Sequence, residues 1–142
     1  MKYSRRELSG LLAAAAVPQG AARGATSLVS KTYQFGELPV HQSAQNLMRP
    51  ILEGQTHTGL PIELHMTELA PGQAPHPAHH HVHEEMILIQ EGLVAVTIAG
   101  HTTNIGPGSV AFVASGEEHG WRNIGTTRAQ YFVLALGRDS GA

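Results

Sequence analysis

The chain has 142 residues, of which 42 % are hydrophobic, so it is long enough for one domain with a core and too short for two ordinary domains. It contains no cysteine, which excludes disulfides and thiol nucleophiles and leaves nitrogen and oxygen atoms as the metal ligands. The formal net charge is −2 and only 5 % of the residues are aromatic, so neither a basic groove nor a stacking platform for nucleic acid is expected.

Residues 1–25 have the pattern of an export signal. The pair Arg5-Arg6 precedes an apolar, alanine-rich run at 11–17, and small residues follow. The segment 4–8 resembles the twin-arginine export motif, and the apolar run is far shorter than the ~20 residues needed to span a membrane. We therefore expect a twin-arginine-like signal peptide over 1–25, export to the periplasm, and no membrane insertion after its removal. Ordinary secretion and an amphipathic first helix packed on the domain are the alternatives.

From Ser27 onward, apolar and polar side chains alternate repeatedly, and no helical periodicity of useful length occurs. The 16 glycines and 8 prolines of the chain favour short strands joined by tight turns. The sequence therefore predicts one all-β domain over 26–137, followed by a frayed tail at 138–142. The expected strands cover residues 28–35, 47–56, 60–69, 79–90, 93–99, 101–105, 109–113, 118–124 and 127–136, and the segment 37–46 is expected to be irregular. The expected core residues are Ile87, Ile89, Val94, Val96, Val110, Phe112, Val133 and Leu136.

Histidine is enriched, with 10 in the chain, and several of them cluster just before Glu85. Side chains two residues apart share a face of a strand, so a strand over 79–90 would direct His79, His81 and Glu85 to one side. Imidazole nitrogen and carboxylate oxygen together suit iron, manganese, nickel, cobalt or zinc. His119, early in a later strand, offers a fourth ligand. A β-bulge that exchanges Glu85 for Glu84 is the alternative register.

These residues lie in two segments that resemble the two sequence motifs of the cupin family. The first motif is G-x5-H-x-H-x3-E-x6-G, matched here by Gly72, His79, His81, Glu85 and Gly92, with six residues in place of five before His79. The second is G-x5-P-x-G-x2-H-x3-N, matched by Gly108, Gly116, His119 and Asn123, with Ala114 in place of the proline. The core motifs therefore span residues 72–123.

The resemblance implies a double-stranded β-helix, or jelly-roll, cupin barrel. It also implies one divalent transition metal, with iron or manganese favoured, bound through His79, His81, Glu85 and His119, and a homodimer. The function it implies is that of a metal-dependent, dioxygenase-like oxidoreductase acting on a small oxygenated substrate. A non-catalytic cupin that binds or senses a metal or small ligand is one alternative, and a metal-dependent isomerase or lyase is the other. No further catalytic residue is identifiable from the sequence.

Other residues near the motifs have more than one interpretation. Trp121 lies two residues after His119 on the same strand, so it is expected in the core or on the pocket wall beside the metal. Asn123 is expected to fix a turn through backbone hydrogen bonds. Which face of its strand His65 occupies is undecided. Exposed positions are expected for His83 and Glu84, positions at the barrel mouth for His76 and His80, and loop positions for His41, His57 and His101.

Overall fold

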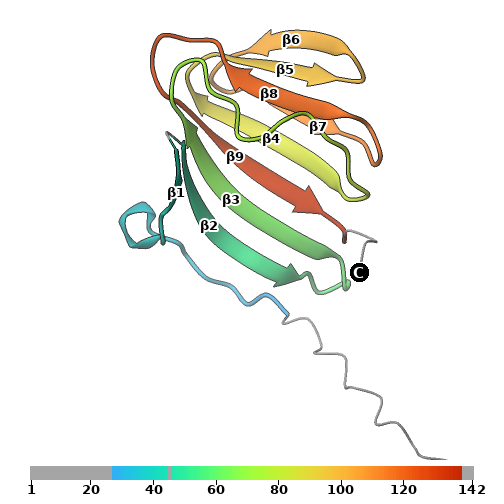
Figure 1. The fold of residues 1–142 in the computed structure, drawn as a ribbon. Helices are drawn as coiled ribbons and strands as arrows, with labels where there is room; N and C mark the ends of the chain where they lie inside the picture. Colours follow the sequence, from blue (N-terminus) through green and yellow to red (C-terminus); the bar gives the residue numbers. More distant parts are fainter. Residues whose placement is uncertain (1–26, 45, 139–142) are drawn as a thin grey trace, which may run out of the picture.

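The computed structural model describes residues 27–44 and 46–138, so the expected signal peptide over 1–25 and the tail after Arg138 lie outside the described residues. In the described part the chain forms two antiparallel sheets that face one another (Figure 1). The larger sheet has the strand order β1-β2-β3-β9-β4-β7 and the smaller sheet has the order β6-β5-β8. Their bounds are β1 (His41–Ser43), β2 (Asn46–Gln55), β3 (Pro61–Leu69), β4 (Glu84–Glu91), β5 (Val94–Ile98), β6 (His101–Ile105), β7 (Val110–Val113), β8 (His119–Asn123) and β9 (Ala129–Leu136).

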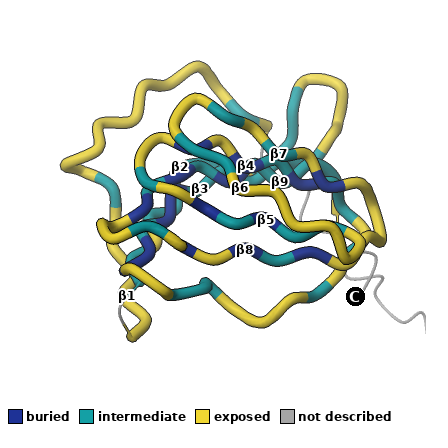
Figure 2. Tube along the Cα trace, turned by 90° about the horizontal axis from the view of Figure 1, so that it is seen from above, coloured by how far each residue is buried: buried dark blue, intermediate teal, exposed yellow. Residues whose placement is uncertain are grey.

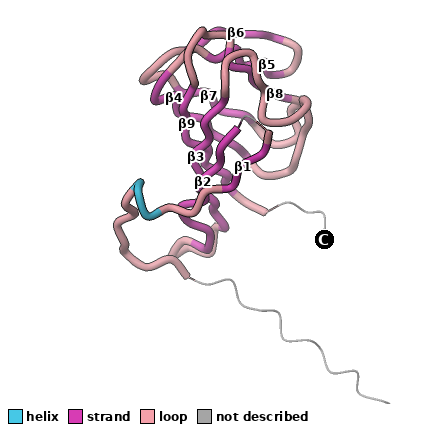
Figure 3. The backbone as a smooth tube through the Cα atoms, turned by 60° about the vertical axis from the view of Figure 1, so that its left-hand side comes forward, coloured by secondary structure: helices cyan, strands magenta, loops and turns pink. Residues whose placement is uncertain are grey.

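The prediction of an all-β domain is confirmed. Within residues 27–44 and 46–138, the single helical element is a 3-10 turn, η1 (Phe35–Glu37), and loops connect the strands (Figure 3). No helix in this part of the chain is long and apolar enough to cross a membrane. The strands expected at 47–56, 60–69, 93–99, 101–105, 109–113, 118–124 and 127–136 correspond to β2, β3, β5, β6, β7, β8 and β9.

Two strand predictions were wrong. The segment 28–35 is not a strand: its contact with β2 is limited to its start, where a bridge joins Ser27 and Gln55 and the N–H of Leu28 donates to the carbonyl of Gln55 at 2.9 Å. The strand expected at 79–90 begins only at Glu84, because residues 79–83 cross from one sheet to the other: His79 pairs with β8 of the smaller sheet, whereas Glu84 already pairs with β9 of the larger sheet.

Two histidines expected in loops lie at strand ends. The segment expected to be irregular contains β1, which pairs with β2 and places His41 opposite Met48. His101 begins β6, opposite Ile98.

The core lies between the two sheets, and strand parity decides which side chains enter it (Figure 2). The prediction was correct for the buried residues Ile87, Ile89, Val94, Val96 and Val133. It was wrong for Val110 and Phe112, which are each 52 % exposed. In the β4–β7 register these two residues pair with Leu88 and Met86, on the outer face of the larger sheet. Leu136 is half-buried.

The turn after β8 is held by a buried amide. Asn123 is fully buried, and its Nδ2 donates hydrogen bonds to the carbonyl oxygens of Leu69 at 2.9 Å and Thr127 at 2.8 Å. Its Oδ1 accepts a hydrogen bond from the backbone N–H of Gly125 at 2.9 Å. Three backbone groups that would otherwise be unpaired are thereby satisfied, as expected for a residue that fixes a turn.

Gly92, in the turn between β4 and β5, should be the glycine least tolerant of a side chain. Its φ is +86°, and a Cβ atom there would lie 2.7 Å from Cα of Ala129 in β9. Gly108 has a similar φ of +81° but no heavy atom within 4 Å of such a Cβ. We expect Gly108→Ala to lower the free energy of unfolding by about 1 kcal/mol, through backbone strain alone. Gly92→Ala should cost about 2 kcal/mol more, because β9 must move.

Urea unfolding of both variants, monitored by tryptophan fluorescence, measures the difference. Equal losses of stability would show that the contact between Gly92 and Ala129 does not constrain the fold.

Candidate metal centre

Three histidines converge from two segments that are far apart in the sequence. His79 and His81 lie on the crossover before β4, and His119 is the first residue of β8. The backbones of His79 and His119 are joined by two hydrogen bonds, each N–H donating to the other carbonyl at 3.0 and 2.8 Å. The backbone N–H of Gly116 donates to the carbonyl of His81 at 2.8 Å. These contacts tie the crossover to the turn that precedes β8.

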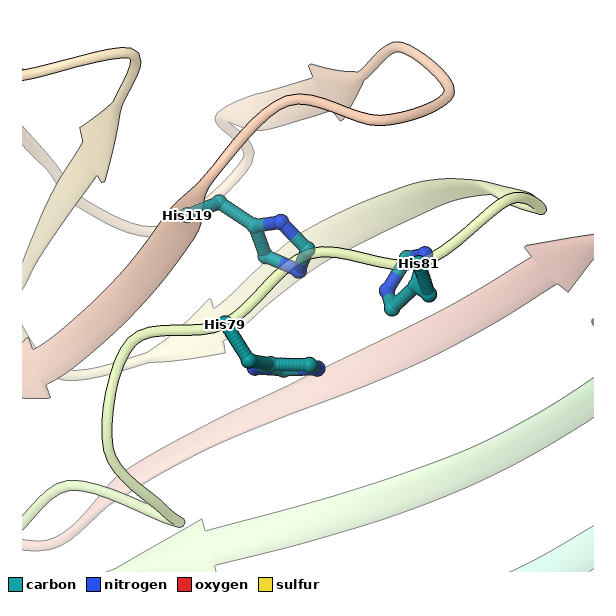
Figure 4. Close-up of side chains that lie close together, drawn as sticks. All are labelled: His79, His81 and His119. Atoms are coloured by element: carbon teal, nitrogen blue, oxygen red, sulfur yellow. The ribbon is translucent and has the colours of Figure 1, made fainter. Parts of the chain in front are cut away.

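The imidazole rings of these residues turn toward a common space (Figure 4). One ring nitrogen of each of the three histidines lies within 4.8 Å of the others, so the three rings could together hold a metal ion. Glu85, on β4, extends into the same space. Its Oε2 lies 3.2 Å from Nε2 of His81 and 3.0 Å from Nε2 of His119. The structure thus brings together all four residues that the sequence predicts as metal ligands.

The route to this convergence differs from the one expected from strand parity. His79 and His81 do not lie on one strand with Glu85, because β4 starts at Glu84. The structure places Glu85, 8 % exposed, beside the histidines. Glu84 points to the opposite face of β4 and pairs with Leu136 of β9.

The expectation that His83 and Glu84 are exposed was wrong. Both residues are half-buried. The ring of His83 stacks on the ring of His81, with centroids 3.6 Å apart. His83 therefore packs against the cluster.

The second nitrogen of two rings fixes their tautomers. Nδ1 of His81 lies 2.9 Å from the carbonyl oxygen of His83, and Nδ1 of His119 lies 2.9 Å from that of Glu117. A carbonyl oxygen only accepts hydrogen bonds, so each Nδ1 carries the proton. In the neutral rings each Nε2 then presents a lone pair to the space between them, as in histidines that ligate metals.

These lone pairs face the Glu85 carboxylate at 3.0 and 3.2 Å, which sets acceptor against acceptor. Such an arrangement is relieved by a proton, on a ring or on the carboxyl group, or by a cation bound between them. The spacing also matches that of ligands at right angles around an ion bound at ~2.1 Å, which are roughly 3 Å apart. The donor set and its geometry therefore fit a divalent metal ion.

His79 provides independent support. Its Nδ1 is buried and has no hydrogen-bond partner among the described residues, a costly state for a polar atom unless an ion or water satisfies it. Burial, followed by repulsion from His76, His119 and His81, lowers the pKa of His79 below the ordinary 6.5. The ring is therefore neutral near pH 7, which is the form that binds metals.

The wall around the cluster contains Trp121 and His76. Trp121 is 5 % exposed, belongs to the core and stacks on His119 with ring centroids 5.7 Å apart, so it both packs in the core and forms the wall beside the cluster. The ring of His76 lies edge-on to that of His79, with centroids 4.3 Å apart. His80 is exposed, and it lines the outer part of a cavity of about 820 Å³ above the cluster.

Sequence reasoning left His65 without a position and did not single out Glu63. Both residues line the 820 Å³ cavity together with His79, His81 and Glu85. Nδ1 of His65 lies 3.0 Å from each carboxylate oxygen of Glu63, two residues earlier on the same face of β3. The two neighbours of His65, Leu64 and Met66, are apolar but lie on the other face of β3. The alternation of apolar and polar residues along β3 therefore indicated two different faces of the strand but did not show which face lines the cavity.

Comparison with known proteins gives a consistent result. A family model described as "Cupin domain" matches residues 65–135, which contain all the residues of the cluster. No curated protein matches the chain in sequence.

Solved structures resemble the fold at low sequence identity. An RmlC-like cupin from Shewanella frigidimarina has a TM-score of 0.63 and 17 % identity, covering 78 % of this chain and 95 % of that one. The polyketide cyclase RemF from Streptomyces resistomycificus has a TM-score of 0.64 and 19 % identity, covering 79 % and 82 %. A predicted oxalate decarboxylase from Thermotoga maritima has a TM-score of 0.63 and 19 % identity, covering 76 % and 100 %. The two antiparallel sheets of this chain and its similarity to these structures together confirm the predicted jelly-roll fold.

Removing the His76 imidazole should raise the pKa of His79. A positive charge on His76 repels the proton on His79, so His76→Asn relieves this repulsion and leaves burial as the main cause of the lowered value. His80→Asn is the matched control, because His80 is an exposed histidine of the same segment that does not contribute to the shift. NMR titration of the ring protons in metal-free protein measures both. A pKa that falls in His76→Asn, or that moves equally in the two variants, would contradict this electrostatic coupling.

Proposed function

The chain belongs to the cupin family, and from this membership and the geometry of its histidine cluster we propose that it is a divalent-metal enzyme acting on a small oxygenated organic substrate. One metal ion would be bound by His79, His81, Glu85 and His119. The observation that carries the proposal is that two imidazole nitrogens, both with the proton on the other ring nitrogen, face one carboxylate at 3.0 and 3.2 Å, an arrangement that a cation between them would stabilise. Iron and manganese are favoured over nickel, cobalt and zinc.

The first candidate activity is that of a dioxygenase-like oxidoreductase. A bound divalent metal would supply Lewis-acid polarisation of a substrate oxygen or activation of dioxygen. Four protein ligands leave room for further ligands around an octahedral ion. The cavity of about 820 Å³ above the cluster gives a small molecule access to that position.

A second candidate, a metal-dependent isomerase or lyase, is favoured by the pair formed by His65 and Glu63. Glu63 orients the His65 ring by contact with Nδ1, so Nε2 is the nitrogen left to take or give a proton in the cavity. A general base of this kind is what carbon–hydrogen or carbon–carbon bond rearrangements require. The similar structures include one named as a cyclase and one as a predicted oxalate decarboxylase.

We further propose that the chain is exported to the periplasm through its twin-arginine-like segment at 4–8. The homodimer that the family resemblance implies would form at the outer edge of the larger sheet. There β7 is an edge strand, and the segment 109–114 carries no charged side chain. An exposed apolar row lies at this edge, formed by Val110 and Phe112 of β7 and Leu88 of the adjacent β4. A second copy of the chain would cover this row.

Metal content tests the ligand set. We expect protein purified without chelators to hold about one equivalent of iron or manganese, measured by elemental analysis. Glu85→Gln and His119→Ala should weaken metal binding by at least about 100-fold, since changes of residues that only hold metal ligands in position already cost about 10–100-fold. His80→Ala, which alters an exposed neighbour, should leave it unchanged. Calorimetry should show affinity falling as the pH drops into the range where the ring nitrogens take up protons, because protons compete with the metal; the lowered pKa of His79 places its own loss of affinity below pH 6.5.

Some results would contradict the ligand set, and others would distinguish between the candidate activities. Metal affinity that does not depend on pH, or that falls equally in His80→Ala, would exclude these ligands. Dioxygen uptake by iron-loaded protein with a panel of small hydroxylated compounds supports the oxidoreductase. Exchange of substrate C–H protons in deuterated water without uptake supports the isomerase or lyase. Firmly bound zinc with neither reaction favours a cupin that only binds or senses a metal.

The dimer has a separate test. Phe112→Glu places a charge in the exposed apolar row and should convert a dimer to a monomer in light scattering. Val29→Glu is the matched control, because Val29 is an apolar residue, 79 % exposed, that lies outside the row. A wild-type monomer, or a dimer unaffected by Phe112→Glu, would remove this interface.

A further inference from the structure

A second, smaller cavity adjoins the metal centre. It has a volume of about 220 Å³ and is lined by residues that include Met48, Thr67, Trp121, Tyr131 and Val133. His65 and Glu85 line both this cavity and the larger one above the cluster. The small cavity therefore meets the metal centre at these two side chains.

Two aromatic side chains form its inner wall. The rings of Trp121 and Tyr131 lie edge-to-face with centroids 5.9 Å apart, and Trp121 Nε1 donates a hydrogen bond to Tyr131 Oη at 2.8 Å. Burial raises the pKa of Tyr131 above its ordinary value, so the phenol stays neutral. Trp121 Nε1 and Tyr131 Oη are thereby paired, and the two buried rings form the apolar floor of the cavity.

The charge on the cavity wall limits what it can bind. Apart from histidines, Glu85 is the only ionisable group lining it with a charge near pH 7, and no lysine or arginine of the described residues is among the lining side chains. Away from a metal ion held at Glu85, a phosphate or carboxylate on the ligand would therefore find no fixed positive partner on this wall. An uncharged ligand with an apolar body fits this wall.

A polar group at the cavity wall selects one further feature. His65 lines both this cavity and the larger one, and contact with Glu63 holds its Nδ1, which leaves Nε2 to pair with a ligand. A hydroxyl on the ligand suits that nitrogen.

We propose that this cavity is the substrate-binding subsite of the metal centre and takes a small, uncharged phenolic compound. The ring packs against Trp121 and Tyr131, and the hydroxyl points to the junction at His65 and Glu85. The volume of about 220 Å³ suits a small molecule. The inference rests on the proposed function, because it names the substrate class of that same metal centre.

Trp121 is the only tryptophan in the chain, so its fluorescence reports the occupancy of the cavity. The probes are phenol, the polyol erythritol and glycerol 3-phosphate, each titrated into zinc-loaded and metal-free full-length protein. Phenol should change the emission in a saturable way and give a binding isotherm in calorimetry, whereas erythritol and glycerol 3-phosphate should do neither. Binding of either polar probe in preference to phenol would overturn the proposal.

Two matched variants locate the binding site. Met48 is 37 % exposed and lines the cavity, so Met48→Lys should fold and weaken phenol binding by about 10-fold, a loss of about 1.4 kcal/mol. Leu93, 42 % exposed, lies in the turn between β4 and β5 and does not line the cavity, so Leu93→Lys should leave binding unchanged. Equal weakening in the two variants, or no weakening in Met48→Lys, would place phenol elsewhere.

The same titrations separate this proposal from the metal proposal. If the protein binds zinc but phenol binds neither the zinc-loaded nor the metal-free form, the proposed phenol site is wrong and the metal-site proposal is unaffected. If phenol binds in the cavity but the protein does not bind zinc, the proposed function is wrong and the cavity remains a ligand site. Tighter phenol binding to zinc-loaded than to metal-free protein supports both.

Discussion

The pair of backbone hydrogen bonds between His79 and His119 is the contact on which the site depends. It is made where the chain leaves the smaller sheet, and five residues later the same segment enters the larger sheet as β4. On this short crossover between two facing sheets, His79 and His81 point into the space between the sheets, whereas His80 and Val82 are exposed. The site is therefore built where the two sheets are joined, and residues from both sheets reach it: His119 from the smaller sheet and Glu85 from the larger one.

The hydrogen bonds of the cluster also determine its chemistry. Backbone carbonyls of His83 and Glu117 hold the protons of His81 and His119 on Nδ1, which turns both Nε2 lone pairs toward Glu85. Without a cation this concentration of acceptors is unfavourable, so the fold maintains a site that is more stable when occupied. Burial of His79 acts in the same direction, because it favours the neutral ring over the protonated one.

Motif spacing predicted the residues of the site better than the strand pattern predicted their surroundings. The positions of His79, His81, Glu85 and His119 depend on local turns and on one crossover, and both leave a signature in the spacing. Pairing partners leave none. The strand predicted at 28–35 does not form, because an alternating segment becomes a strand only where it pairs along its length with another strand. The prediction placed Val110 and Phe112 in the core because both faces of this edge strand carry apolar residues, so hydrophobicity does not show which face is buried.

The position of His65 shows the same limit with a functional consequence. Its apolar neighbours Leu64 and Met66 mimic a core-facing pair, yet it is His65 that faces the cavity with Glu63. A polar residue can line the inner face here because it borders a cavity of about 820 Å³ instead of a packed core. Glu85 and His65 stand at the boundary between this wet region and the aromatic wall of Trp121 and Tyr131. A ligand bound across that boundary would bury its apolar part and keep its oxygen beside the metal centre, which is the orientation that chemistry at the metal requires.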